Sequence, residues 1–101
     1  MSDALPGDPQ DGNRHVLRLF VSGATPRSTR AIANLRRILE QALPGRYDLA
    51  VIDIYQDAQA ARDHQVVAAP TLVKLAPEPV RRIIGDLSDE ARVLRGLGLQ
   101  P

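Results

Sequence analysis

The sequence contains no cysteine and no tryptophan, and only Phe20, Tyr47 and Tyr55 of its 101 residues are aromatic. Because the thiolate is the nucleophile of thiol-dependent redox enzymes, a chain without cysteine cannot carry out that chemistry. Three rings are also too few for a surface on which the bases of single-stranded nucleic acid would stack. The hydrophobic core therefore consists mainly of Leu, Ile, Val and Ala, and the composition favours binding over redox catalysis.

A strong excess of charge of one sign is also missing. The net charge is +1; residues 1–14 contribute −2, so the remaining 87 residues carry +3. This small excess gives little support to nonspecific nucleic-acid binding but permits a local basic patch that faces an acidic protein. The N-terminus lacks the features of a secretory signal, and no apolar run is long enough to cross a bilayer. Together with the absence of cysteine, this predicts a cytoplasmic protein.

Ligand clusters for metals or phosphates are absent as well. His15 and His64 are isolated from each other and from any group of carboxylates. The glycines never form a phosphate-binding loop. We therefore expect no metal site, no cofactor and no catalytic residue, and we interpret both histidines as ordinary surface or edge residues.

Residues 1–14 are rich in Pro, Gly and Asp, and we predict a disordered tail there, followed by one domain over residues 15–101. The apolar run at 16–22 predicts a strand. Thr25 and Pro26 are typical of a helix start, and the apolar spacing that follows predicts a helix up to Pro44. Residues 47–54 are apolar on both faces, which predicts a second, parallel strand that is covered on both sides.

The second half predicts a short helix capped by Asp57, then two strands at residues 71–75 and 80–84 that form an antiparallel hairpin around a proline-rich turn. Ser88 is predicted to cap a final helix over residues 89–97. The order βαβαββα is the thioredoxin-like arrangement, a single α/β domain. The loop where thioredoxins carry their cysteines holds Ser22, Thr25 and Ser28 instead. Capping is the favoured role for Thr25, and a glutathione-linked enzyme is the alternative.

Two groups of residues allow two interpretations each. Arg81 and Arg82 are predicted to point to opposite faces of a strand, where they either protect an exposed edge or, with Arg30 and Lys74, attract an acidic partner. The X-Pro bonds that precede prolines near the hairpin either form a rigid turn or provide a slow barrier between two packings. These prolines are Pro70, Pro77 and Pro79.

Residues 15–99 resemble the KaiB family of circadian clock proteins. The most specific stretch is APTLVKLAPEPVRRIIGDLS, residues 69–88, and it is supported by residues 17–28 and by Tyr47 with Val51, Ile52 and Asp53. The resemblance implies a non-enzymatic adaptor that binds the N-terminal ATPase ring of a KaiC-like hexamer, regulates its phosphorylation cycle and sequesters KaiA where KaiA exists. The partner-binding residues that it implies are Arg30, Tyr47, Lys74, Arg81 and Arg82.

The resemblance also implies two folds, a thioredoxin-like monomer and a ground state with a rearranged C-terminal half that is often tetrameric. The residues implied in this switch are Pro70, Pro77, Pro79, Gly85, Asp86 and Gly96. The chain departs from the family at Ala50, where a lysine is frequent, and at Gly98, where an acidic residue is common. Because the local patterns agree with the thioredoxin-like form, we predict this form and a monomer. A stress-response or signalling module of KaiB type is the alternative function.

Overall fold

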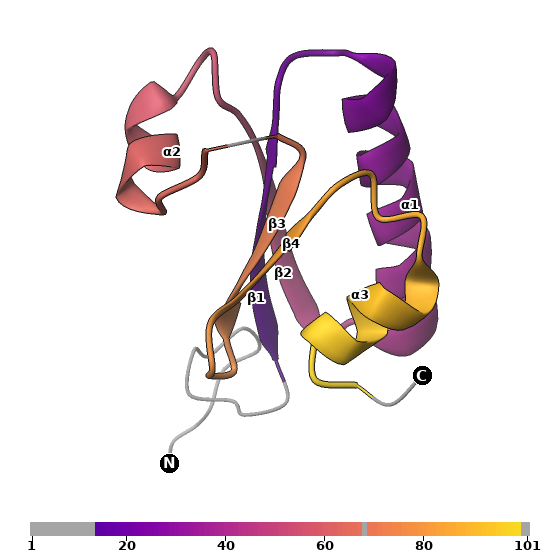
Figure 1. The fold of residues 1–101 in the computed structure, drawn as a ribbon. Helices are drawn as coiled ribbons and strands as arrows, with labels where there is room; N and C mark the ends of the chain where they lie inside the picture. Colours follow the sequence, from indigo (N-terminus) through magenta and orange to yellow (C-terminus); the bar gives the residue numbers. More distant parts are fainter. Residues whose placement is uncertain (1–13, 68, 100–101) are drawn as a thin grey trace.

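The computed structural model describes residues 14–67 and 69–99. They form four strands and three helices in the predicted order (Figure 1). The bounds are β1 (His15–Val21), α1 (Pro26–Ala42), β2 (Tyr47–Asp53), α2 (Ala58–Asp63), β3 (Thr71–Ala76), β4 (Arg81–Ile84) and α3 (Glu90–Gly96). Of the predicted tail, residues 1–13 lie outside the described part, whereas Arg14 donates hydrogen bonds to the carbonyl oxygens of Gly45 and Tyr47.

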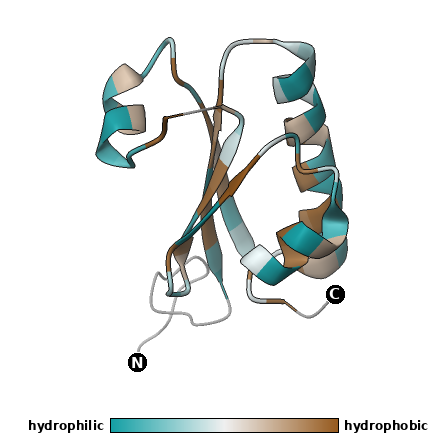
Figure 2. Ribbon diagram, in the orientation of Figure 1, coloured by the Kyte–Doolittle hydropathy of each residue, from teal (hydrophilic) through white to brown (hydrophobic). Residues whose placement is uncertain are grey.

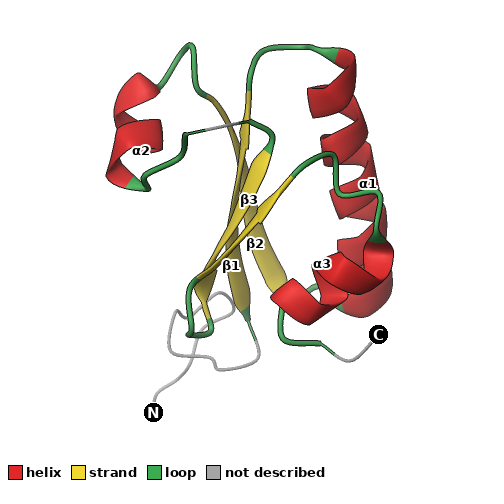
Figure 3. Cartoon of the chain, in the orientation of Figure 1, coloured by secondary structure: helices red, strands yellow, loops and turns green. Residues whose placement is uncertain are grey.

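The strands, which are yellow in Figure 3, form one sheet, and their order in it is β2-β1-β3-β4. The predicted parallel pairing of β1 with β2 and the predicted β3–β4 hairpin are both confirmed. One detail is wrong: β2 is an edge strand, and none of its residues is fully buried. Val51, at the centre of β2, remains 37% exposed. Apolar residues on both faces predict a strand covered on both sides, but an edge strand can carry such residues half-buried.

The main core lies between the sheet and the pair α1 and α3, which cover the same face (Figure 1). Leu17 and Leu19 of β1 and Leu35 of α1 are completely buried there. Each such leucine contributes about 1.5–3 kcal/mol by leaving water. The regularly spaced apolar residues of α1 therefore form its buried face, as predicted.

The opposite face of the sheet is covered by α2. Phe20, Val73 and Ala61 form a second, smaller cluster there, and the Phe20 ring lies 5.6 Å from the His64 ring, centroid to centroid. In Figure 2, α2 is largely hydrophilic while hydrophobic colours run through the strands. The short helix thus adds little apolar surface, and alanine allows it to lie close to the sheet.

Two of the three predicted helix caps are confirmed. Thr25 accepts a hydrogen bond from the Ser28 amide at 3.2 Å, and Asp57 accepts one from the Ala60 amide at 3.0 Å. The third cap is wrong, because Asp89 caps α3 by accepting from the Arg92 amide at 3.1 Å, whereas Ser88 belongs to the preceding turn. Neighbouring residues with equal capping ability explain the shift by one position.

Candidate partner-binding surface

Two cations lie side by side on the face of the sheet that carries α1 and α3. Lys74 of β3 is directly opposite Arg81 of β4 in the antiparallel register. Lys74 is only 4% exposed, while Arg81 is exposed. Neither forms an ion pair with a carboxylate of the described residues. Burial lowers the pKa of Lys74, and the neighbouring Arg81 charge lowers it further. A carboxylate supplied from outside would therefore be stabilised here.

Arg82 belongs to the other face of the same strand. Its Nη2 donates a hydrogen bond to the carbonyl oxygen of His64 at 2.9 Å, which connects β4 to the end of α2. The strand alternation thus directs Arg81 and Arg82 to opposite sides. A partner that contacts both must reach around the β4 edge, which pairs only with β3.

Arg30 lies on α1 and is engaged within the chain. Its Nε donates to Oδ2 of Asp86 at 3.5 Å, and 58% of its side chain is exposed. Asn34, one turn further along α1, donates to the carbonyl oxygen of Asp86 at 2.9 Å. Exposed ion pairs contribute about 0–1 kcal/mol, so a partner can replace this one at low cost. Arg30 therefore holds the loop after β4 against α1.

Tyr47 begins β2, at the opposite edge of the sheet from β4. Its hydroxyl donates to the Glu40 carboxylate, and this hydrogen bond, together with slight burial, raises the pKa of Tyr47. Tyr47, Glu40, Arg36 and Leu49 line a hollow of about 260 Å³. Because β1 and β3 separate the two edges, the structure does not bring Tyr47 together with Arg81.

The prolines of the predicted switch flank the hairpin. Pro70 is buried directly before β3, and Pro77 and Pro79 lie in the turn between β3 and β4. The peptide bonds preceding all three are cis. Gly85, which follows β4, adopts φ +124° and donates its N–H to the carbonyl oxygen of Pro70 at 3.0 Å. The beginning of β3 and the end of β4 are thereby tied together.

The other two predicted switch residues contact the C-terminal helix region. Asp86 accepts a hydrogen bond from the Ser88 amide at 3.1 Å, and hydrogen bonding by Ser88 lowers the pKa of Asp86. Gly96 in α3 lies against the Ile83 side chain of β4, where a Cβ would overlap it. The part these residues take in a change of fold stays a prediction.

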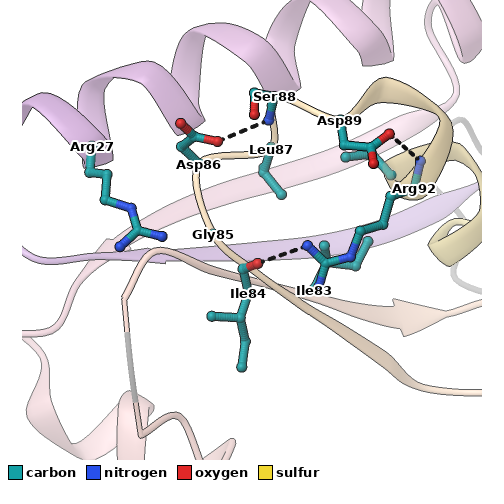
Figure 4. Close-up of a pocket in the computed structure, with 10 residues that line it drawn as sticks. Arg27, Ile83, Ile84, Gly85, Asp86, Leu87, Ser88, Asp89 and Arg92 are labelled. Carbon is teal, nitrogen blue, oxygen red and sulfur yellow. Dashed lines mark hydrogen bonds between the residues drawn. The ribbon is translucent and has the colours of Figure 1, made fainter.

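Sequence reasoning missed a hollow around residues 85–89 (Figure 4). Its volume is about 230 Å³, and Arg27 and Arg92 are among its lining residues. Arg27 comes from the start of α1, and Arg92 from α3. No sequence signal links these two arginines, because only the folded chain brings them to the same loop.

The loop that holds cysteines in thioredoxins is occupied here by hydroxyl groups that serve the backbone. Ser28 is fully buried, and its Oγ accepts a hydrogen bond from the Ser22 amide at 3.2 Å. Thr25 accepts from the Ser28 amide as the helix cap. These contacts give the hydroxyls a structural role at the start of α1.

Residues 14–67 and 69–99 contain no group of three or more His, Cys, Asp or Glu side chains placed to hold a metal ion. None of the helices in these residues is sufficiently long and apolar to span a membrane.

Solved structures with this architecture are thioredoxin-like. The N-terminal domain of SasA from Synechococcus elongatus superimposes with a TM-score of 0.72 at 24% identity, covering 97% of this chain and 90% of that one. Mitochondrial thioredoxin 3 from Saccharomyces cerevisiae gives a TM-score of 0.69 at 21% identity, covering 85% of this chain and 78% of that one. The fold therefore defines a thioredoxin-like protein, here without a thiol in its sequence.

The family follows from the sequence comparisons. The KaiB domain model matches residues 18–99. The circadian clock oscillator protein KaiB of Nostoc punctiforme is 53% identical over 85 residues, which are 84% of this chain and 82% of that protein. KaiB1 of a Synechocystis species is 52% identical over 85 residues, 84% of this chain and 81% of that protein. The chain belongs to the KaiB family of circadian clock oscillator proteins.

Proposed function

We propose that this chain is a non-enzymatic clock adaptor of the cytoplasm that binds the N-terminal ATPase ring of a KaiC-like hexamer and regulates its phosphorylation cycle. Membership of the KaiB family supports the clock role. The observation that carries the binding proposal is the pair of Lys74 and Arg81, which lacks an acidic partner among the described residues. Where KaiA exists, the complex also sequesters it.

The energetic argument rests on the desolvated lysine. A partly desolvated ammonium without a counter-ion is unfavourable in the free protein, in agreement with the lowered pKa of Lys74. A partner carboxylate that reaches Lys74 and Arg81 gains two charge-assisted contacts and relieves this cost. Charge complementarity at such a site also excludes partners with a basic surface.

The test measures association of the purified chain with the KaiC-like protein of the same organism, in each nucleotide state, by size-exclusion chromatography with light scattering. Arg81→Glu places a like charge against the acidic partner and is expected to weaken binding by at least about tenfold. Arg95→Glu is the matched control, because Arg95 is exposed on α3 and lines neither hollow. Far-ultraviolet circular dichroism verifies that both variants fold.

The regulatory half of the proposal has its own readout. Adding the chain to the KaiC-like protein is expected to change the time course of its phosphorylation, followed by gel shift, and Arg81→Glu is expected to abolish the change. Absence of association in every nucleotide state contradicts the proposal and favours a stress-response or signalling module of KaiB type. Equal binding by Arg81→Glu and the unsubstituted chain contradicts the assigned surface.

A further inference from the structure

The hollow around residues 85–89 has a concave wall with positively charged sides. Figure 4 shows Arg27 on one side of Gly85 and Arg92 on the other. The hollow measures about 230 Å³, which is enough for a side chain from another molecule. It lies at the end of β4 that is far from the proline turn.

The two arginines have unused hydrogen-bonding capacity. Arg27 is exposed, and its side chain has no hydrogen bond or ion pair within the described part of the chain. Arg92 uses Nη1 to donate to the carbonyl oxygen of Ile84 at 3.2 Å. A guanidinium carries five N–H donors, so this single bond leaves most of the Arg92 donors free while it holds the side chain in place.

The acidic side chains of the wall are occupied elsewhere. Asp86 accepts from the Ser88 amide through Oδ1 and from Arg30 through Oδ2. Asp89 caps α3 through the Arg92 amide. Among the described residues, neither carboxylate forms an ion pair with the Arg27 guanidinium.

Gly85 keeps the hollow open. A Cβ at this position would lie 3.8 Å from Nη2 of Arg27, so any larger side chain would enter the space in front of the guanidinium. The backbone here has φ +124°, which side-chain-bearing residues rarely adopt. The hydrogen bond from Gly85 to the Pro70 carbonyl holds this conformation.

We propose that Arg27 and Arg92 form a subsite that binds one carboxylate, from an aspartate or glutamate side chain of a protein partner. The planar fork of a guanidinium matches the two oxygens of a carboxylate. The wall carries Arg27 and Arg92 against Asp86 and Asp89, a net charge of zero, which suits a singly charged group better than a phosphate with its higher charge. The inference rests on the proposed function only in taking the ligand from a protein.

A titration followed by ¹H–¹⁵N correlation spectroscopy tests the subsite in the full chain. The probes are N-acetyl-aspartate N-methylamide, its neutral asparagine analogue and inorganic phosphate, each at millimolar concentrations. The aspartate probe is expected to shift the Gly85 amide and the Arg27 Nε resonances to saturation, and the asparagine probe is not. Lack of saturation with the aspartate probe, or equal shifts with the asparagine probe, overturns the proposal. Binding of phosphate without binding of aspartate overturns the carboxylate assignment.

Matched variants separate the subsite from general charge effects. Arg27→Gln removes the charge but keeps a polar side chain, and it is expected to weaken binding of the aspartate probe about fivefold. Arg95→Gln removes the same charge outside the hollow and is expected to leave probe binding unchanged. Equal weakening by both variants overturns the subsite.

The outcomes also separate this inference from the proposed function. If the KaiC-like protein binds but the aspartate probe does not, the subsite alone is wrong. If the probe binds and the KaiC-like protein does not, the proposed partner alone is wrong.

Discussion

The Nζ atom of Lys74 lies 3.8 Å from the position that a Cβ on Gly98 would occupy. Lys74 is in β3, and Gly98 follows α3 in the chain. A side chain at position 98 would therefore point toward this cation, but the residue there is a glycine. Burial lowers the pKa of Lys74, the Arg81 charge lowers it further, and no side chain at position 98 opposes these two effects.

A carboxylate introduced at position 98 should supply that counter-ion. Gly98 has φ +81°, so any side chain there costs about 1 kcal/mol in backbone strain. Gly98→Asn carries the same strain without the charge. We expect Gly98→Asp to be about 1 kcal/mol more stable to urea than Gly98→Asn at neutral pH, and to raise the pKa of Lys74, measured by ¹³C NMR of the lysine Cε.

The control uses a glycine with a similar positive φ and open space at the Cβ position. Gly45 has φ +70°, and no atom lies within 4 Å of a Cβ built on it. Gly45→Asp and Gly45→Asn should therefore be equally stable. Equal stability of the two Gly98 variants as well would contradict the proximity of Lys74.

Lys74 also predicts a pH dependence of stability. Because its folded pKa lies below the usual 10.5, the unfolded chain binds more protons between the two values, and stability rises with pH there. Lys74→Met is expected to be about 1 kcal/mol more stable at neutral pH. This difference should narrow as pH rises toward 10.5, as measured by urea unfolding at several pH values. A constant difference would show that the lysine charge does not contribute.

The raised pKa of Tyr47 acts in the same pH range with the opposite sign. Its folded state retains the proton longer, so stability falls as pH rises above 10.0, the usual value for tyrosine. Tyr47 is present in both proteins of the Lys74→Met comparison. The difference between them therefore reports Lys74 alone.

The order of elements was predictable because it depends on local signals. Thr25 before Pro26 determines where α1 begins, and the apolar spacing of the helix matches its buried stripe. The burial of Lys74 was not predictable in the same way. Its strand is apolar on both faces, so the sequence gives no sign that the lysine lies on the core side next to Leu72.

The candidate surface was only partly predictable, because its geometry depends on contacts between distant segments. The register that places Arg81 opposite Lys74 depends on a turn whose length the prolines leave open. The pairing of Arg30 with Asp86 joins α1 to the loop after β4. Arg27 was not singled out at all, since its importance comes from the glycine that faces it.

The hydrogen bonds of Asp86 should make the stability of the fold depend on pH in the acidic range. Hydrogen bonds from Ser88, assisted by Arg30, hold the pKa of Asp86 below the usual 3.8. The ionised Asp86 carboxylate therefore stabilises the fold above pH 3.8, and this stabilisation is lost as pH falls through the lower pKa of the folded state. Asp86→Asn removes the charge but keeps an acceptor for Ser88. We expect its stability, followed by circular dichroism, to fall less steeply below pH 3.8 than that of the unsubstituted chain.

Asp48→Asn is the matched control for this experiment. Asp48 is exposed on β2, and its side chain makes no hydrogen bond within the described residues. This substitution removes the same charge and should leave the steepness of the acid transition unchanged. If Asp48→Asn and Asp86→Asn have the same effect, the net charge determines the transition and the contacts of Asp86 do not.

The contact between Gly96 and Ile83 predicts how far α3 tolerates a larger residue. Ile83 is 6% exposed, so a Cβ at position 96 would press on a side chain that is already packed in the core. Gly96→Val should therefore destabilise the thioredoxin-like form by about 1–3 kcal/mol through overpacking. The loss of stability would not come from helix propensity, because valine has a better helix propensity than glycine.

A double-mutant cycle isolates this packing effect. Ile83→Val removes the Cδ1 atom nearest to position 96 and costs about 0.5–1.5 kcal/mol by itself. In this background Gly96→Val should cost about 1 kcal/mol less than in the unsubstituted chain, because the two side chains then share the space. Additive effects of the two substitutions in urea unfolding would show that α3 does not depend on this contact, and Gly96 would then have to act in some way other than by packing against β4.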